Sequence, residues 1–328
     1  MKIAVVAEIK KGILSRGTLE VLAAAQYLRG KTQVEVISLL AGSGVKGLAE
    51  SLIHYGADEV VVADDKILAS YDSKVYLDTL ESMGREINAA VILCPGSLRG
   101  AELVPRLGYR LGGGTVTDCI GLNWSEADRR LIATKPVYGG KTLADMVITK
   151  LPQVLTMRAR VWEPVVADRS RQGKIREIKG LVNDGGPQKV IRETYREKSK
   201  GLNIEDADVV VSGGRGIGGE EGFQLLEQLA GIFGGAVGAS RAAVDAGWVP
   251  ASYQVGQTGK IIGPTLYFAV GISGASQHIA GITSAKHIVA INKDEDAPIF
   301  RVTELGVIED YRKILPLLIK KLGEKKGN

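Results

Sequence analysis

The feature that most limits the possible folds is the stretch from Ile261 to Ala285, which contains no Asp, Glu, Lys or Arg. A membrane helix needs about 20 apolar residues, so its length alone would suit one. However, Pro264, several glycines and many hydroxyl and amide side chains would leave polar groups without partners in lipid. We therefore expect no membrane insertion. An uncharged, glycine-dense stretch instead favours a backbone folded closely around a polar or charged ligand.

The local pattern of this stretch predicts a ligand-binding junction. Leu266–Ile272 is typical of a buried strand, the strand breaks near Gly274, and Ala275–Ile282 has helical spacing. Such a junction directs backbone N–H groups and the positive end of a helix dipole at one point, which suits an anion such as phosphate. The polar side chains expected around it are Ser273, Ser276, Gln277 and His278. The next predicted strand ends at Asn292, at the edge where open α/β sheets bind ligands.

Strand-like and helix-like segments alternate through the first half of the chain. The strand-like runs are Lys2–Glu8, Val34–Leu40, Glu59–Ala63 and Ala89–Cys94. The helical stretches are Arg16–Arg29, Val45–Tyr55, Lys74–Ile87 and Leu98–Leu111. This alternation predicts an α/β fold with a doubly wound, mostly parallel sheet. The ranges Asp118–Ile132 and Pro136–Arg160 are interpreted as antiparallel strand pairs added to one edge.

A length of 328 residues favours two domains. We expect a first α/β domain over residues 1–168, a basic linker over 169–204 and a second doubly wound domain over 205–328. The excess of Lys and Arg between 169 and 200 is larger than the net charge of +5 for the whole chain. A run of this kind is usually a solvated face, and it lacks the interleaved aromatics of a single-strand binder, so we expect no nucleic-acid binding.

Several other classes of site are unlikely on composition. The chain has two cysteines, Cys94 and Cys119, and no CxxC, which disfavours a disulfide framework, a zinc site and an iron–sulfur cluster. With three histidines and no recognisable nucleophile-and-base motif, we expect neither a metal site nor a hydrolytic centre. The apolar run Ile3–Ala7 is too short for a secretory signal, which predicts a cytoplasmic chain.

A second glycine motif lies at the start of the second domain. Gly214, Gly216 and Gly219 fit GxGxxG between a strand, Asp206–Val211, and a helix, Glu221–Phe233. That context favours a dinucleotide pyrophosphate. A nicotinamide site also needs an acidic residue about 20 positions further on, where this chain has Ala236–Ser240 and Asp245 comes late. The motif thus indicates a dinucleotide outside the usual NAD arrangement.

Four positions allow two interpretations each. Arg215 either contacts a pyrophosphate or is a surface arginine, and Arg241 either faces an anionic or electron-rich ligand or forms a buried salt bridge with Asp245. Asp310 either binds a ligand or complements the dipole of a final helix over Val307–Leu322. A turn at residues 96–100 either binds an anion or simply joins a strand to a helix.

Three blocks identify a family resemblance: GQTGK (256–260), AVGISGASQH (269–278) and IVAINKDEDAPIF (288–300). In this order they closely resemble the C-terminal signature of the electron transfer flavoprotein alpha subunit. The likeness continues through SGGRG (212–216) and GASRAAVDAGWVP (238–250), and more loosely over the first half of the chain. It implies a non-covalent FAD in the second domain. It also implies a beta subunit that carries AMP or a second FAD, against which the first domain packs.

The resemblance assigns a role to each group of site residues. The pyrophosphate and its flanking sugars would be held by Arg215, Ser240, Ser273 and Gln277, with backbone N–H groups of Ser273, Gly274, Ala275, Ser276, Gln277 and His278. The adenosine end would meet Asn292, Asp310 and Tyr311, and the isoalloxazine would lie along Val255, Gly256, Gln257 and Thr258. Thr258 would face flavin N5, His278 the C2 carbonyl and Arg241 the ring, where a cation favours an anionic semiquinone.

The implied function is an electron carrier without substrate turnover of its own. It would pass single electrons from flavin dehydrogenases, such as the acyl-CoA dehydrogenases of fatty acid oxidation, to a quinone reductase or a ferredoxin. NADH oxidation would be added if the complex bifurcates electrons. Two alternatives remain open from the residues: a self-sufficient NAD(P)-dependent oxidoreductase, and a regulatory module that binds an adenine nucleotide.

Overall fold

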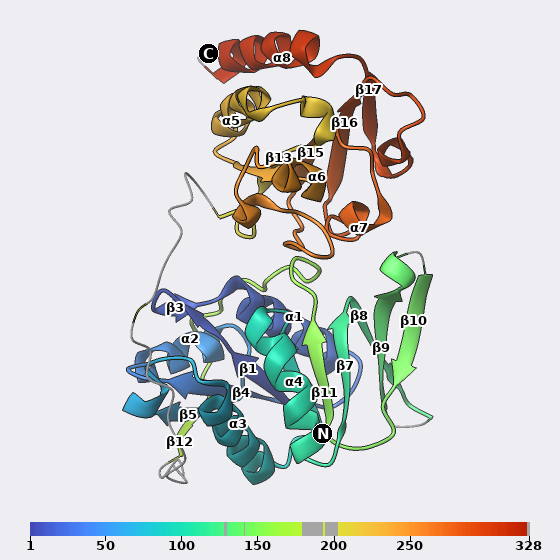
Figure 1. The fold of residues 1–328 in the computed structure, drawn as a ribbon. Coiled ribbons are helices and arrows are strands. Elements are labelled where there is room, and N and C mark those ends of the chain that lie inside the picture. Colours follow the sequence, from blue (N-terminus) through green and yellow to red (C-terminus); the bar gives the residue numbers. More distant parts are fainter. Residues whose placement is uncertain (128–129, 141, 179–192, 194–202, 327–328) are drawn as a thin grey trace. The chain divides into compact units, whose positions relative to one another are not determined.

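The computed structural model describes residues 1–127, 130–140, 142–178, 193 and 203–326. The chain divides into two compact units, Met1–Thr194 and Tyr195–Asn328. Each unit has its own parallel sheet with helices, which confirms the predicted α/β class (Figure 1). Within the described ranges, no helix combines the length and the apolar character that a membrane crossing requires.

The first unit is built on a seven-stranded sheet with the order β12-β5-β4-β1-β6-β11-β7. Its strands are β1 (Lys2–Ala7), β4 (Glu35–Gly42), β5 (Glu59–Asp64), β6 (Val91–Pro95), β7 (Gly114–Cys119), β11 (Gln153–Met157) and β12 (Lys174–Glu177). Every pairing in this sheet is parallel. The chain first builds outward from β1 through β4 and β5, and then returns to the other side of β1 with β6.

Four helices cover this sheet: α1 (Arg16–Arg29), α2 (Ala49–His54), α3 (Ser73–Ile87) and α4 (Leu98–Arg110), with single turns at η1 (Lys46–Leu48) and η2 (Lys66–Leu68). Side chains of β1 alternate between two cores. Ile3 and Val5 lie in one core with Leu22 of α1. Ala4 and Val6 lie in the other with Leu80 of α3. The period-two pattern of the strand therefore buries both of its faces.

The helices begin where the sequence supplies capping side chains. Ser15 Oγ accepts a hydrogen bond from the Thr18 N–H at the start of α1. The carboxylate of Asp72 accepts from the N–H groups of Lys74 and Val75 at the start of α3. A side-chain acceptor at this position satisfies a backbone donor that has no partner inside the helix. These caps explain why the expected starts of both helices lie within one residue of the observed ones.

The prediction of antiparallel strand pairs over 118–132 and 136–160 is partly wrong. The strands β8 (Gly121–Ser125), β9 (Arg130–Val137) and β10 (Thr142–Val147) do form an antiparallel sheet, with η3 (Tyr138–Gly140) between the last two. However, β11, which falls in the range 136–160, pairs in parallel with both β6 and β7. All five residues of β11 are buried, as expected of a strand inside a parallel sheet. A small hairpin, β2 (Ile9–Lys10) with β3 (Ile13–Leu14), follows β1.

The basic segment expected as a linker begins inside the first unit. Its residues Lys174–Glu177 form the edge strand β12, which pairs with β5. Arg176 also forms an ion pair with Glu59, at 2.9 Å. The boundary between the units therefore falls later than residue 169. The rest of the expected linker, residues 179–192 and 194–202, lies outside the described part of the chain.

The second unit has a five-stranded parallel sheet with the order β14-β13-β15-β16-β17. The strands are β13 (Val209–Gly213), β14 (Ala236–Ala239), β15 (Leu266–Val270), β16 (His287–Asn292) and β17 (Leu305–Ile308). The helices are α5 (Phe223–Ile232), α6 (Arg241–Asp245), α7 (Ser276–Ile279) and α8 (Tyr311–Lys326). Short turns are η4 (Arg215–Ile217), η5 (Glu220–Gly222), η6 (Ala251–Tyr253) and η7 (Pro298–Val302).

The two faces of this sheet are covered differently. Helices α5 and α8 pack on one face, with Leu226 and Leu315 in its core. Isoleucines from irregular segments, including Ile262 and Ile282, fill the other face. The helix predicted over 275–282 is only the four-residue α7. Beyond it the chain tightens into three-residue turns, with the N–H of Ile282 bonded to the Ile279 carbonyl, because Gly281 packs directly on the backbone of Gly256.

Candidate functional site

A cavity of about 670 Å³ opens at the carboxyl ends of the strands in the second unit. It lies where β13 is flanked by β14 on one side and β15 on the other, so that the order of the strands changes direction. Ligands of open α/β sheets bind at such a point. The volume falls within the ~300–1,000 Å³ range of small-molecule and cofactor sites.

Most of the predicted site residues line this cavity. They are Arg215, Ser240, Arg241, Val255, Gly256, Gln257, Thr258, Ser273, Ala275, Gln277, His278 and Asn292. Asp310 and Tyr311 line a neighbouring hollow of about 230 Å³ that shares Arg215, Gly216 and Asn292 with the main cavity. Gly274 and Ser276 line neither of these two spaces. Lys293 and Asp294 also line the main cavity and were missed, although their place directly after the end of β16 could have indicated them.

The segment after β15 presents backbone donors. Gly271 (φ +60°) and Gly274 (φ +82°) adopt the left-handed conformation, and a Cβ on Gly274 would overlap the backbone of Ile299. Among the described residues, none accepts a hydrogen bond from the N–H groups of residues 273–277. Consecutive free N–H groups around a left-handed residue form a concave anion site. This observation supports the predicted phosphate position.

Two glycines of the GxGxxG motif have a packing role within the fold. Gly214 and Gly216 pack against the backbone of Gly271, and their N–H groups bond to the carbonyls of Val270 and Gly271 at 2.9 Å. A Cβ on Gly219 would meet no described atom within 4 Å, whereas the third glycine of a dinucleotide fingerprint allows close packing of helix and strand. The motif therefore holds two loops together. Between its glycines, Arg215 is exposed at the cavity wall.

His278 is the most buried polar side chain of the site, with 6% of its surface exposed. Its Nε2 lies 2.8 Å from the hydroxyl of Tyr267, which is itself fully buried. Its Nδ1 is buried and has no hydrogen-bond partner in the described part of the chain. Burial lowers the pKa of His278 to about 4, and the backbone of Val255 opposes this shift to a smaller extent. The imidazole is therefore neutral at pH 7.

The surroundings of Arg241 differ from the expectation. The guanidinium was expected in an apolar setting, but 69% of the side chain is exposed, and it pairs with Asp245 at 3.2 Å. Both residues belong to α6, one turn apart, so this pair lies on the helix surface. Ser240, immediately before the helix, contrasts with the exposed and paired Arg241. Ser240 lines the cavity, and its Oγ is buried without a partner among the described residues.

The segment 255–258 is fixed by its backbone; the Val255 side chain lies in the core, and the exposed residues Gln257 and Thr258 border the cavity. The N–H of Val255 bonds to the Ala239 carbonyl and that of Gln257 to the Gln277 carbonyl, both at 2.8 Å. Thr258 is exposed, and its Oγ1 accepts a hydrogen bond from Gln254 Nε2 at 2.9 Å. Its hydroxyl proton is thereby left available.

The three residues expected at the adenosine end are engaged within the fold. Asn292 Nδ2 donates to the Ile272 carbonyl at 3.0 Å. Asp310 Oδ1 accepts from the Arg312 N–H at 2.9 Å, as a cap of α8, which is the helix-terminus interpretation. The Tyr311 hydroxyl donates to the Ile217 carbonyl at 2.8 Å. Each still borders the hollow, but none presents a side chain without a partner.

The donor set fits a phosphate-bearing cofactor better than a metal. The described residues contain no group of three or more His, Cys, Asp or Glu that could hold a metal ion. In contrast, the free N–H groups of Ser273, Ala275 and Gln277 border one cavity, and the buried Ser240 Oγ and His278 Nδ1, of residues that line it, lack partners among the described residues. A buried polar atom without a partner costs roughly 1–3 kcal/mol, so these two side-chain atoms indicate a ligand that would satisfy them.

Comparison with known proteins agrees with this interpretation. Residues 3–180 match the model described as the electron transfer flavoprotein domain, and residues 203–283 match the electron transfer flavoprotein FAD-binding domain. The chain is 40% identical over 321 residues to an electron transfer flavoprotein subunit alpha of Thermoanaerobacterium thermosaccharolyticum, covering 98% of this chain and 97% of the relative.

Two further relatives carry the same description. The subunit alpha of Megasphaera elsdenii is 40% identical over 326 residues, with 98% and 96% of the two chains covered. That of Bacillus subtilis is 38% identical over 317 residues, with 97% and 96% covered. Since both domain models match in order and the relatives align over nearly their whole length, this chain belongs to the electron transfer flavoprotein alpha-subunit family.

Proposed function

We propose that the cavity of the second unit holds FAD and that the chain passes electrons singly as the alpha subunit of a heterodimer. The beta subunit would carry AMP or a second FAD. The donors would be flavin dehydrogenases, such as acyl-CoA dehydrogenases, and the acceptor a quinone reductase or a ferredoxin, in the cytoplasm. The observation that carries the proposal is the set of polar groups at one cavity without partners among the described residues: the N–H groups of Ser273, Ala275 and Gln277, with Ser240 Oγ and His278 Nδ1.

The residues at the cavity divide into two ends. The free N–H groups of 273–277, with Ser240 and the exposed Arg215, would hold the pyrophosphate. The segment 255–258 and His278 would border the isoalloxazine. The bound flavin supplies the redox chemistry, since it accepts and gives electrons one or two at a time. What the protein adds is position, exclusion of water and fixed hydrogen-bond donors.

Tyr267 determines how His278 would act. Burial raises the pKa of the Tyr267 phenol, so the phenol keeps its proton at neutral pH. When this O–H donates to Nε2 of the neutral imidazole, the imidazole proton resides on Nδ1. Nδ1 is the buried nitrogen without a hydrogen-bond partner among the described residues. In this arrangement His278 offers a neutral N–H donor toward the flavin carbonyl.

Arg241 then supplies charge from the solvent side. Its surface pair with Asp245 is worth little, because exposed ion pairs contribute about 0–1 kcal/mol. The guanidinium can therefore leave Asp245 for a ligand at low cost. Its effect on the flavin potential is smaller than that of a buried cation, since water screens a side chain that is 69% exposed.

The proposal is tested by co-expressing the chain with its beta subunit and measuring the visible spectrum and the flavin content of the purified complex. We expect a yellow protein with at least one FAD per heterodimer, and release of the flavin on denaturation. A colourless complex, or one that holds only a nicotinamide or an adenine nucleotide, would favour one of the two alternatives instead.

A further inference from the structure

The first unit has a cavity of its own at the carboxyl end of its sheet, and the proposed flavin chemistry does not use it. It measures about 190 Å³ and is bordered by the ends of β1, β4 and β6 and by the first turn of α4. In the strand order β5-β4-β1-β6, this is the point where the chain changes direction, which is where doubly wound sheets bind ligands. The volume is below the ~300 Å³ of a drug-sized site, so it suits a single ring system.

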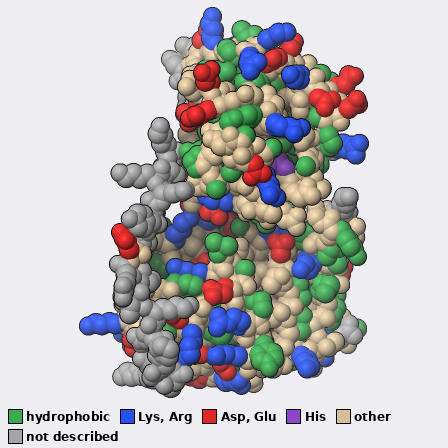
Figure 2. Space-filling model, in the orientation of Figure 1, with side chains coloured by type: hydrophobic (Ala, Val, Ile, Leu, Met, Phe, Trp, Pro, Cys, Tyr) green, Lys and Arg blue, Asp and Glu red, His purple; other side chains and the backbone are tan. Residues whose placement is uncertain are grey.

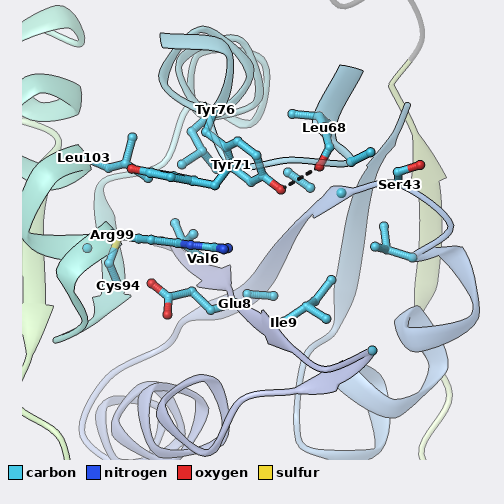
Figure 3. Close-up of a pocket in the computed structure, with 18 of the residues that line it drawn as sticks. Val6, Glu8, Ile9, Ser43, Leu68, Tyr71, Tyr76, Cys94, Arg99 and Leu103 are labelled. Carbon is cyan, nitrogen blue, oxygen red and sulfur yellow. Dashed lines mark hydrogen bonds between the residues drawn. The ribbon is translucent and has the colours of Figure 1, made fainter. Parts of the chain in front are cut away.

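The walls of this cavity combine aliphatic and aromatic surface with polar groups. Val6, Leu68, Leu80 and Leu103 contribute aliphatic surface, and the rings of Tyr71 and Tyr76 lie above it (Figure 3). The two tyrosine hydroxyls are held away from the cavity by hydrogen bonds, Tyr71 to Glu102 at 2.8 Å and Tyr76 to the Leu68 carbonyl at 3.0 Å. The rings therefore face the space with their carbon surfaces.

Three charged residues border this space: Glu8, Arg99 and the exposed Lys11. The Arg99 guanidinium lies over the Tyr71 ring, 4.7 Å from its centroid, and Figure 3 shows the two as parallel layers with the carboxylate of Glu8 below. Within the described residues, no carboxylate comes within ion-pair distance of Arg99. Glu8 Oε1 accepts a hydrogen bond from Ser97 Oγ at 2.5 Å, and no described residue donates a hydrogen bond to Oε2. A planar donor group and an open acceptor thus stand side by side.

A free anion is not the natural ligand of this cavity. The N–H groups of Gly44, Val45 and Lys46, which follow β4, already donate to the carboxylate of Asp64 at 2.6–3.0 Å. The start of α4 already faces the carboxylate of Glu8 through Ser97. Both positions that would attract a phosphate therefore hold a carboxylate, which would repel one.

We propose that this cavity binds the base of a nucleoside, stacked on the Arg99–Tyr71 layer, with its edge toward Glu8 and its sugar toward the opening. A nucleobase is a neutral planar ring with donors and acceptors alternating along its edge. Arginine and tyrosine faces stack on such rings, at ~1–3 kcal/mol per base for aromatic stacking. The carboxylate accepts from an exocyclic amine or ring N–H. The guanidinium contributes its charged face to the stack. This site is separate from the flavin cavity.

The test uses the full chain with its partner subunit, saturated with FAD so that the second unit is occupied. Adenosine, guanosine, uridine and inorganic phosphate are titrated by calorimetry, and saturation-transfer NMR compares the base and ribose protons. We expect at least one nucleoside to bind, with stronger transfer to base than to ribose protons. Glu8→Gln and Arg99→Met should each weaken binding by about tenfold or more.

Arg106→Met is the matched control, because Arg106 lies on the same helix with its side chain 43% exposed and paired with Glu102. It should leave the affinity unchanged within about twofold. Nucleoside sites on the partner subunit are unaffected by these substitutions, so a difference between variants reports on this cavity. The proposal is overturned by the absence of nucleoside binding, by equal affinity in wild type and both site variants, or by binding of phosphate alone.

Discussion

At the scale of single residues, the site is defined by polar atoms that the fold buries without satisfying. His278 and Ser240 could be named from the sequence because each lies in a block with a family resemblance, next to glycines. The burial of these two side chains could not be predicted from the sequence. Arg241 shows the limit: the sequence places it in an apolar, glycine-rich stretch, but the short helix α6 turns its side chain into solvent beside Asp245.

The depressed pKa of His278 predicts a loss of stability in acid. The folded chain holds the imidazole neutral down to about pH 4, whereas the unfolded chain protonates it near 6.5. Below pH 6.5 the unfolded state therefore binds more protons, and stability falls as the pH drops toward 4. Between pH 7 and 5 this difference amounts to about 2 kcal/mol. Urea unfolding of the flavin-free chain at both pH values measures it.

His278→Gln provides the comparison for this pH effect, because it removes the titrating group and keeps a polar side chain. The variant should lose about 2 kcal/mol less than the wild type between pH 7 and 5, whatever its stability at pH 7. Equal losses in the two proteins would show that other groups cause the acid sensitivity.

Ser240→Ala should change flavin binding and stability in opposite directions. The buried Oγ has no partner among the described residues, so without a ligand its removal should leave the free energy of unfolding unchanged or raise it by about 1 kcal/mol. With the flavin bound, the same change removes a hydrogen bond, and the affinity for FAD should fall about five- to tenfold. Fluorescence titration and urea unfolding measure the two effects. A variant that is less stable without flavin, and that binds FAD as tightly as the wild type, would mark Ser240 as a structural residue.

At the scale of elements, capping residues and alternating patterns made the first helices and strands predictable. The helix over Arg16–Arg29 is observed with the predicted bounds, because Ser15 caps it and Gly30 ends it. Several strands escaped prediction, and two of them, β11 and β12, did so for opposite reasons. β11 is buried on both faces within a region that otherwise forms hairpins, and β12 is a mostly exposed, charged edge strand that resembles a linker in sequence.

The loop after β15 is the element on which the flavin site depends, and Gly274→Ala tests it. Gly274 has φ +82°, and a Cβ there would overlap the backbone of Ile299. We expect a loss of about 2 kcal/mol or more in stability, together with loss of FAD from the complex. Gly219→Ala is the matched control, since its backbone is extended and open space surrounds it. Gly219→Ala should keep wild-type stability and should retain FAD. Loss of flavin in this variant would instead support the predicted contact between the GxGxxG motif and the dinucleotide.

At the scale of the whole molecule, charge carries little of the function. Figure 2 shows Lys and Arg side chains interspersed with Asp and Glu over the visible face. The described residues on that face thus form no single basic surface. The parallel sheets and their ligand edges followed from the alternating pattern. The ligand proposed for the cavity of the first unit could not be predicted from the sequence, because Glu8, Tyr71 and Arg99 are far apart in the chain.

The separation of the hydrophobic cores predicts that the second unit folds alone. Its two core clusters draw only on residues from Ile204 onward, whereas the fully buried members of the other two lie between Ile3 and Met157. Since no buried core residue is shared among the described residues, a fragment of residues 203–328 should unfold cooperatively on heating, as followed by circular dichroism. The fragment of residues 1–194 is the matching sample and should do the same. A fragment 203–328 that shows no cooperative transition, while the full chain does, would mean that its stability depends on the first unit and that the flavin site is not built by one domain.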